Sequence, residues 1–137
     1  SQHEEDIERL GGNHALFLVN TLTKERQRLY PYDRNVEVLW SPTGQYVLVN
    51  DYRGSDSAVP LIFLIGEKIT CIVLEKDLAE QIQNNPHIWK NHHVYITGSE
   101  WTAQDVLKIK IEGYGDVDPD GFTLWFEYHI GKGFTAL

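Results

Sequence analysis

The segment Val36–Asp51, with the sequence VEVLWSPTGQYVLVND, constrains the fold of this chain more than any other stretch. Two runs rich in β-branched and aromatic residues, Val36–Trp40 and Tyr46–Val49, flank the tetrapeptide Ser41–Gly44. The proline of this tetrapeptide presets φ at about −65°, and Gly44 accepts backbone conformations that other residues avoid. This is the chemistry of a tight turn, so the pattern predicts a β-hairpin.

Strand-like runs recur along the rest of the chain at intervals of roughly ten residues, which gives about nine short candidate strands. One helical stripe, Leu74, Leu78 and Ile82, follows the sixth of them. The chain is 42% hydrophobic and 12% aromatic, as is usual for a folded globular protein. No apolar run approaches the roughly 18 residues of a membrane span. We therefore expect one antiparallel all-β domain over residues 1–137 with one short inserted helix, and a helical or frayed segment at 1–12.

Two single residues carry local expectations. Pro31 follows the strand-like run Gln27–Tyr30 and is expected to end it, because proline cannot donate a ladder hydrogen bond. Cys71, the single cysteine, lies in the apolar run Ile69–Leu74, where a buried and unreactive thiol is expected.

The hairpin segment also carries a resemblance to a known structural unit. It resembles the strand–turn–strand unit of WD-repeat and TolB-type β-propeller blades, with Thr43 in place of the usual aspartate and with matches at Trp40, Ser41, Pro42, Gly44 and Tyr46. The resemblance implies blade-like sheets and a binding-scaffold role. A closed propeller needs four or more blades of about 40 residues, which 137 residues cannot supply. We expect blade-like meanders packed as a two-sheet sandwich or an incomplete propeller.

The charge of the chain bears on its partners and its location. A net charge of −8 repels phosphate, so the composition argues against a nucleic-acid partner and favours a basic protein partner. The chain has no methionine, which fits removal of a secretory signal and fits an expression-tag remnant almost as well. We expect a periplasmic or secreted protein.

An aspartate-rich segment follows the second-last strand-like run. Asp116, Asp118, Asp120 and Gly121, with Glu127, satisfy the spacing D-x-D-x-D-G-x5-E, which resembles an EF-hand calcium loop. EF-hand loops lie between helices, whereas the flanking residues here alternate as strands do. Glu127 then lies about 20 Å of extended chain beyond Asp120. The alternatives are a Pro-Asp-Gly turn or a calcium site made by the three aspartates alone, and we expect no other cofactor.

The polar segment Asp51–Ser57, DYRGSDS, is the candidate for catalysis. It holds two serines, but it has no G-x-S-x-G elbow, and the chain has no nucleotide-binding motif. A small hydrolase with a site in this loop is therefore the less favoured alternative. It would require a pocket that joins the loop to a histidine.

Binding residues are suggested by aromatic and charged side chains outside the expected core. In Phe122–Ile130 the even-numbered residues are apolar and predicted to face inward, which places Trp125 on the polar face. Trp125, Tyr52 and Arg53 are of the residue types that dominate interface energetics, and Asp56 adds charge beside them. We expect a non-enzymatic protein-binding module, such as an inhibitor or a toxin-neutralising immunity protein. A calcium-stabilised extracellular β domain is the alternative.

Overall fold

The computed structural model describes residues 14–81 and 86–137. The chain forms two compact units, Ser1–Val36 and Glu37–Leu137. The predicted helical or frayed segment 1–12 lies outside the described residues, and the prediction of one domain over residues 1–137 stays a prediction.

The first unit contains a two-stranded antiparallel hairpin made of β1 (His14–Val19) and β2 (Arg26–Tyr32). The expectation that Pro31 ends the second strand is wrong, because Pro31 lies inside β2 and pairs in register with Ala15. In a two-stranded sheet each strand forms hydrogen bonds to a neighbour on one side only. A residue whose N–H would point to the other side can therefore be proline.

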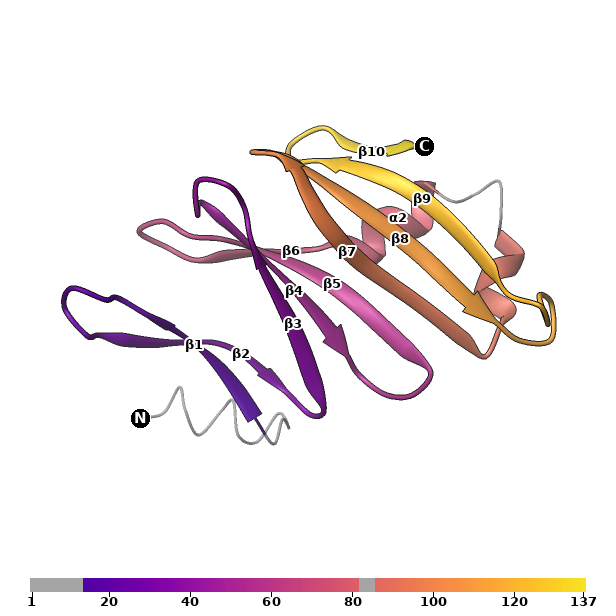
Figure 1. Cartoon of the computed structure of the whole chain (residues 1–137), viewed down its shortest axis with the longest axis horizontal. Coiled ribbons are helices and arrows are strands. Elements are labelled where there is room, and N and C mark those ends of the chain that lie inside the picture. Colours follow the sequence, from indigo (N-terminus) through magenta and orange to yellow (C-terminus); the bar gives the residue numbers. More distant parts are fainter. Residues whose placement is uncertain (1–13, 82–85) are drawn as a thin grey trace. The chain divides into compact units, whose positions relative to one another are not determined.

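A four-stranded antiparallel meander follows (Figure 1), made of β3 (Asn35–Trp40), which starts at the boundary of the two units, β4 (Tyr46–Tyr52), β5 (Ser57–Leu64) and β6 (Thr70–Val73). Its first turn confirms the predicted hairpin. The N–H of Gly44 donates to the carbonyl of Ser41 at 2.9 Å, and Gly44 has φ of +77°. The hydroxyl of Ser41 accepts the N–H of Tyr46 at 3.0 Å, which closes the turn from its buried side.

A second antiparallel meander follows the helical region (Figure 1) and consists of β7 (His93–Ala103), β8 (Val106–Tyr114), β9 (Phe122–His129) and β10 (Gly133–Ala136). The two meanders join because Ser57 and Ala58 of β5 pair in parallel with Val94 and Tyr95 of β7. This ladder differs from the purely antiparallel expectation. Beyond Pro60, which lacks an N–H, β5 pairs instead with β6 from Leu61 onward.

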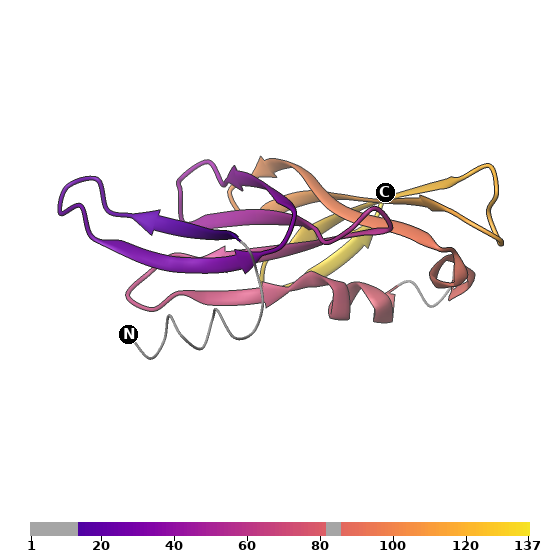
Figure 2. The same ribbon diagram turned by 90° about the horizontal axis from the view of Figure 1, so that it is seen from below.

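Two short helices connect the meanders: α2 (Leu74–Gln81) and the 3-10 helix η1 (Pro86–Lys90). Leu74 and Leu78 of α2 are fully buried, as the helical stripe predicts, whereas the third residue of the stripe, Ile82, lies outside the described residues. The helix α2 packs against one face of the sheet (Figure 2). The core also includes Ile62, Ile96 and Ile109 from the strands. Within residues 14–81 and 86–137, neither helix is long and apolar enough to cross a membrane.

The described strands confirm an all-β fold with a short inserted helix. Ten strands form two sheets, one of two strands and one of eight. The strand β10 was not anticipated from the sequence. The expectation that Cys71 is buried is wrong, because the residue is exposed on the short strand β6. A strand of four residues buries only part of its apolar run against its neighbour β5. The expectation of an unreactive thiol stays a prediction.

Candidate functional site

The main candidate is the solvent side of β7, β8 and β9, which we call the outer face. Alternation along these strands sends one set of side chains into the core and leaves the other outside, as in any half-buried sheet. The ladder registers align the outside residues in rows. The outer face consists of Tyr95, Thr97, Lys108, Lys110, Glu112, Thr123, Trp125 and Glu127.

Trp125 lies in the middle of this face, as the sequence predicts, and its side chain is 36% exposed. The ammonium group of Lys108 lies 4.7 Å from the centroid of the indole ring, and that of Lys110 lies 5.8 Å from it. Lys110 is the direct register partner of Trp125 across the β8–β9 ladder. Cation–π contacts of this kind hold an aromatic ring in a defined orientation while leaving part of it accessible.

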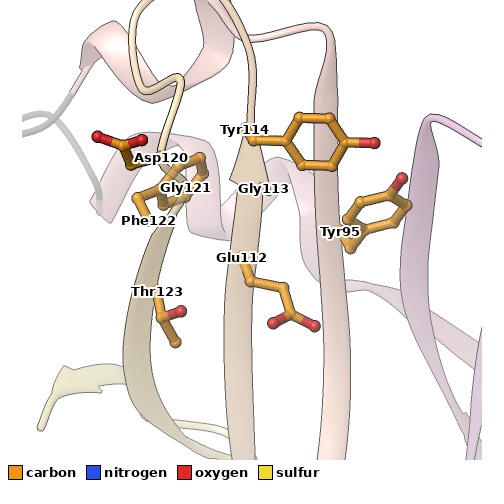
Figure 3. A pocket seen from close by; sticks show the side chains of 8 residues that line it. All are labelled: Tyr95, Glu112, Gly113, Tyr114, Asp120, Gly121, Phe122 and Thr123. Carbon is orange, nitrogen blue, oxygen red and sulfur yellow. The ribbon is translucent and has the colours of Figure 1, made fainter.

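A pocket of about 450 Å³ opens at the end of the outer face next to the β8–β9 loop. Figure 3 shows Tyr95, Tyr114 and Glu112 projecting from β7 and β8, with Asp120, Phe122 and Thr123 on the β9 side. Gly113 and Gly121 complete the lining. The lining therefore combines three aromatic and two acidic residues, with the tyrosine rings and the Glu112 carboxylate on the β7–β8 side and the Asp120 carboxylate pointing away from them (Figure 3).

The tyrosines of the pocket are held by hydrogen bonds and stacking. The Tyr95 hydroxyl donates to the carbonyl of Ser55, and the imidazole of His93 stacks on the Tyr114 ring at a centroid distance of 4.2 Å. Burial, followed by interaction with Tyr114 and with the carboxylates of Asp56 and Glu112, raises the pKa of Tyr95 above its ordinary value. The hydroxyl therefore stays neutral at physiological pH and remains a hydrogen-bond donor to Ser55.

The loop Asp51–Ser57 lies beside the same end of β7. The N–H of Val94 donates to the carbonyl of Asp56 at 3.1 Å, which ties the loop to β7. Arg53 is exposed and lies 3.9 Å from Glu75 of α2 and 4.0 Å from the buried Asp51. Tyr52 is half-buried, and its pKa is raised by burial and then by the charges of Glu37 and Glu112. Arg53 thus contacts carboxylates, whereas Trp125 contacts lysines.

The three predicted metal ligands point to different partners. Asp118 accepts a hydrogen bond from the buried Asn91 amide at 2.9 Å, and Asp116 lies 3.1 Å from the Nε2 atom of His92. Asp120 lines the pocket. Glu127 lies within β9, opposite Lys108. Among the described residues, no three His, Cys, Asp or Glu side chains gather as a metal site. Calcium binding by Asp116, Asp118 and Asp120 stays a prediction.

A second hollow, of about 220 Å³, tests the hydrolase alternative. Asp56, Ser57, Trp89 and His92 are among its lining residues, so it joins the polar loop to a histidine. His92, however, is hydrogen-bonded to Asp116 through Nε2, and in the described part of the chain no hydrogen bond links it to Ser57. The hollow therefore brings a serine and a histidine together without the hydrogen bond by which a histidine activates a serine hydroxyl. A hydrolase stays a prediction.

Several residues of the candidate site were missed in the sequence. Lys108, Lys110 and Glu112 alternate with Leu107, Ile109 and Ile111 of β8, so the alternation used to place Trp125 also puts them on the polar face. Tyr95 and Tyr114 carried no such signal. Their closeness depends on the β7–β8 register, which pairs His93 with Tyr114.

Comparison with protein-family models, with curated proteins and with solved structures finds no match for this chain. The likeness of Val36–Asp51 to propeller blades therefore remains a resemblance, and function has to be argued from the site.

Proposed function

We propose that this chain is a non-enzymatic protein-binding module and that the outer face of β7–β9 contacts the partner. The observation that carries the proposal is Trp125, which is 36% exposed in the centre of a regular ladder and held there by two lysines. Interfaces are commonly anchored by a few tryptophan, tyrosine and arginine side chains. The strands on either side keep Trp125 and its neighbours in place before a partner arrives, which lowers the entropic cost of binding.

The charged side chains of the outer face are suited to recognising a specific partner. Lys110 lies 3.1 Å from Glu112, and His129 lies 3.3 Å from Glu127, so charges of both signs are exposed around the tryptophan. Such rim charges steer a partner and set its orientation more than they add affinity. An inhibitor or an immunity protein that binds a basic partner in the periplasm or outside the cell is the form of module that the overall charge of −8 favours.

The test is capture of partners by the immobilised protein from a lysate of the organism that supplies the gene. Trp89 gives a matched control, because it is also a tryptophan with 36% exposure but lies on η1. We expect Trp125→Ala to weaken capture of the dominant partner at least tenfold, since hot-spot residues contribute about 2 kcal/mol or more. Trp89→Ala should leave capture unchanged.

Folding has to be checked alongside capture. Trp125→Ala should lower the free energy of unfolding by about 2 kcal/mol without unfolding the chain, because the side chain loses partly buried apolar contacts and cation–π contacts but lies outside the core. Equal losses of capture for both tryptophan variants, or no loss for Trp125→Ala, would refute the outer face as the binding surface. Absence of any captured protein would count against the binding-module proposal itself.

A further inference from the structure

The pocket beside the outer face has a composition that selects for one kind of ligand. Its lining includes the aromatic residues Tyr95, Tyr114 and Phe122 and the acidic residues Glu112 and Asp120, and the Glu112 carboxylate lies on the same side as the two tyrosine rings (Figure 3). Aromatic faces attract cations through the negative potential of the ring, and carboxylates attract them directly. An anion would meet two like charges here.

The lining is organised before any ligand arrives. Tyr95 is held by its hydrogen bond to Ser55, and Tyr114 is stacked on His93. Gly113 forms the floor, and a Cβ atom added there would come within 2.0 Å of the His93 carbonyl. The strands therefore approach too closely at this point for any larger residue. The buried Asn91 holds the adjoining loop by accepting the N–H groups of Val117 and Asp118 at 3.2 and 2.9 Å.

A lysine of the chain itself already contacts one of the carboxylates of the pocket lining. The ammonium group of Lys110 lies 3.1 Å from the Oε1 atom of Glu112, on the side of Glu112 that faces Trp125. Lys110 is not part of the pocket lining, whereas Glu112 is. The carboxylate is therefore shared between a neighbouring lysine outside the pocket and whatever occupies the pocket. The carboxylates of Asp120 and the nearby Asp56 add further negative charge.

We infer that the pocket holds an arginine side chain of the protein partner, with its guanidinium group against the tyrosine rings and the Glu112 carboxylate, which lie on the same side of the pocket (Figure 3). A guanidinium is planar, stacks on aromatic rings and presents forked donors that match a carboxylate. The volume of about 450 Å³ admits the whole side chain together with its flanking backbone. This inference rests on the proposed function only because it assigns the arginine to a protein partner. The arginine of that partner would then bind next to Trp125.

The experiment is a titration of the isotopically labelled chain with N-acetyl-arginine amide, followed by NMR. N-acetyl-citrulline amide is the control probe, because citrulline has nearly the same shape without the charge. We expect the arginine probe to shift the amide signals of Gly113, Gly121 and Thr123 in a saturable way and the citrulline probe to bind at least tenfold more weakly. N-acetyl-lysine amide distinguishes a guanidinium site from a general cation site.

Variants assign the binding to the pocket. Glu112→Gln should weaken the arginine probe about tenfold, since hydrogen bonds to charged groups are the strong ones. Glu67→Gln, which makes the same charge change at an exposed turn, should have no effect. Lys110→Gln should tighten binding severalfold by removing the competing ammonium group. If Glu112→Gln folds poorly, Tyr114→Leu, which removes an exposed ring of the lining, replaces it as the test.

The outcomes separate this inference from the proposed function. Equal shifts with arginine and citrulline probes, equal affinity for the lysine probe, or unchanged affinity in both Glu112→Gln and Tyr114→Leu would overturn the arginine pocket, whatever the capture experiment shows. Specific binding of the arginine probe without any captured protein would keep the cation site and refute its assignment to a protein partner.

Discussion

The two hairpins β4–β5 and β8–β9 are both antiparallel pairs of similar length, yet they differ in how many faces they bury. Residues Tyr46–Asp51 of β4 and Ala58–Phe63 of β5 are buried without interruption. In β8 and β9, buried residues alternate with more accessible ones, and the accessible set forms the outer face. The first pair serves the stability of the fold, whereas the second can lose polar side chains without opening the core.

The polar residues of the two pairs show the same difference. Asn50 is fully buried in β4, where its amide donates to the carbonyl of Gly98 at 2.8 Å and accepts the N–H of Gly98 at 2.8 Å. It thereby bonds both backbone groups of Gly98, the residue just before a register shift in the β7–β8 ladder. Glu112 and Lys110 in β8 instead pair with each other at the surface. A polar residue in the doubly buried pair is structural, and one on the outer face is available for binding.

The largest expected effect comes from breaking the buried pair. Asn50→Ala leaves the N–H and the carbonyl of Gly98 without their partner inside the protein, so we expect the free energy of unfolding to fall by about 3 kcal/mol. Thr97 precedes Gly98 in β7 and lies on the outer face. Thr97→Ala should change the free energy of unfolding by less than about 1 kcal/mol. Urea denaturation followed by tryptophan fluorescence measures both. Similar losses for the two variants would remove the distinction between the two pairs.

A smaller effect is expected from Gly98, where β7 approaches β4. A Cβ atom added at Gly98 would lie 2.3 Å from the Cδ2 atom of Leu48. Because that atom ends a flexible side chain, Gly98→Ala should cost about 2 kcal/mol rather than prevent folding. Ser99→Ala, at the next and exposed position, is the control. Combining Gly98→Ala with Leu48→Ala should give less than the sum of the two single effects, and strict additivity would show that the steric contact is not the cause.

The smallest effect concerns pH and the outer face. The pKa of Tyr95 is raised in the folded chain from 10.0, chiefly by burial. The folded protein therefore holds this proton more tightly than the unfolded chain, so the contribution to stability is complete below about pH 10 and is lost as the pH rises further. Stability measured between pH 8 and 11 should fall less steeply for Tyr95→Phe than for the unchanged protein. Identical pH profiles would contradict this assignment.

The local features of the fold follow from the sequence because they depend on neighbours along the chain. The Ser41–Gly44 turn needs only proline and glycine chemistry, and the burial of Leu74 and Leu78 needs only helical periodicity. The exposure of Trp125 follows from alternation within β9. Pro31 and Cys71 were misjudged for one shared reason: whether a strand tolerates proline or buries a thiol depends on which strands lie beside it.

The tertiary structure alone decided where the pocket lies and what lines it. The parallel pairing of Ser57 and Ala58 with Val94 and Tyr95 brings together segments 37 residues apart, and the sequence contains no local signal for it. The same holds for the β7–β8 register that sets Tyr95 opposite Glu112. The local sequence determined which residues form turns, the helix and the alternating strands, because these structures depend on interactions between residues close together in the chain. Which strands become neighbours depends on the burial of the whole core, and that choice assembled the candidate site.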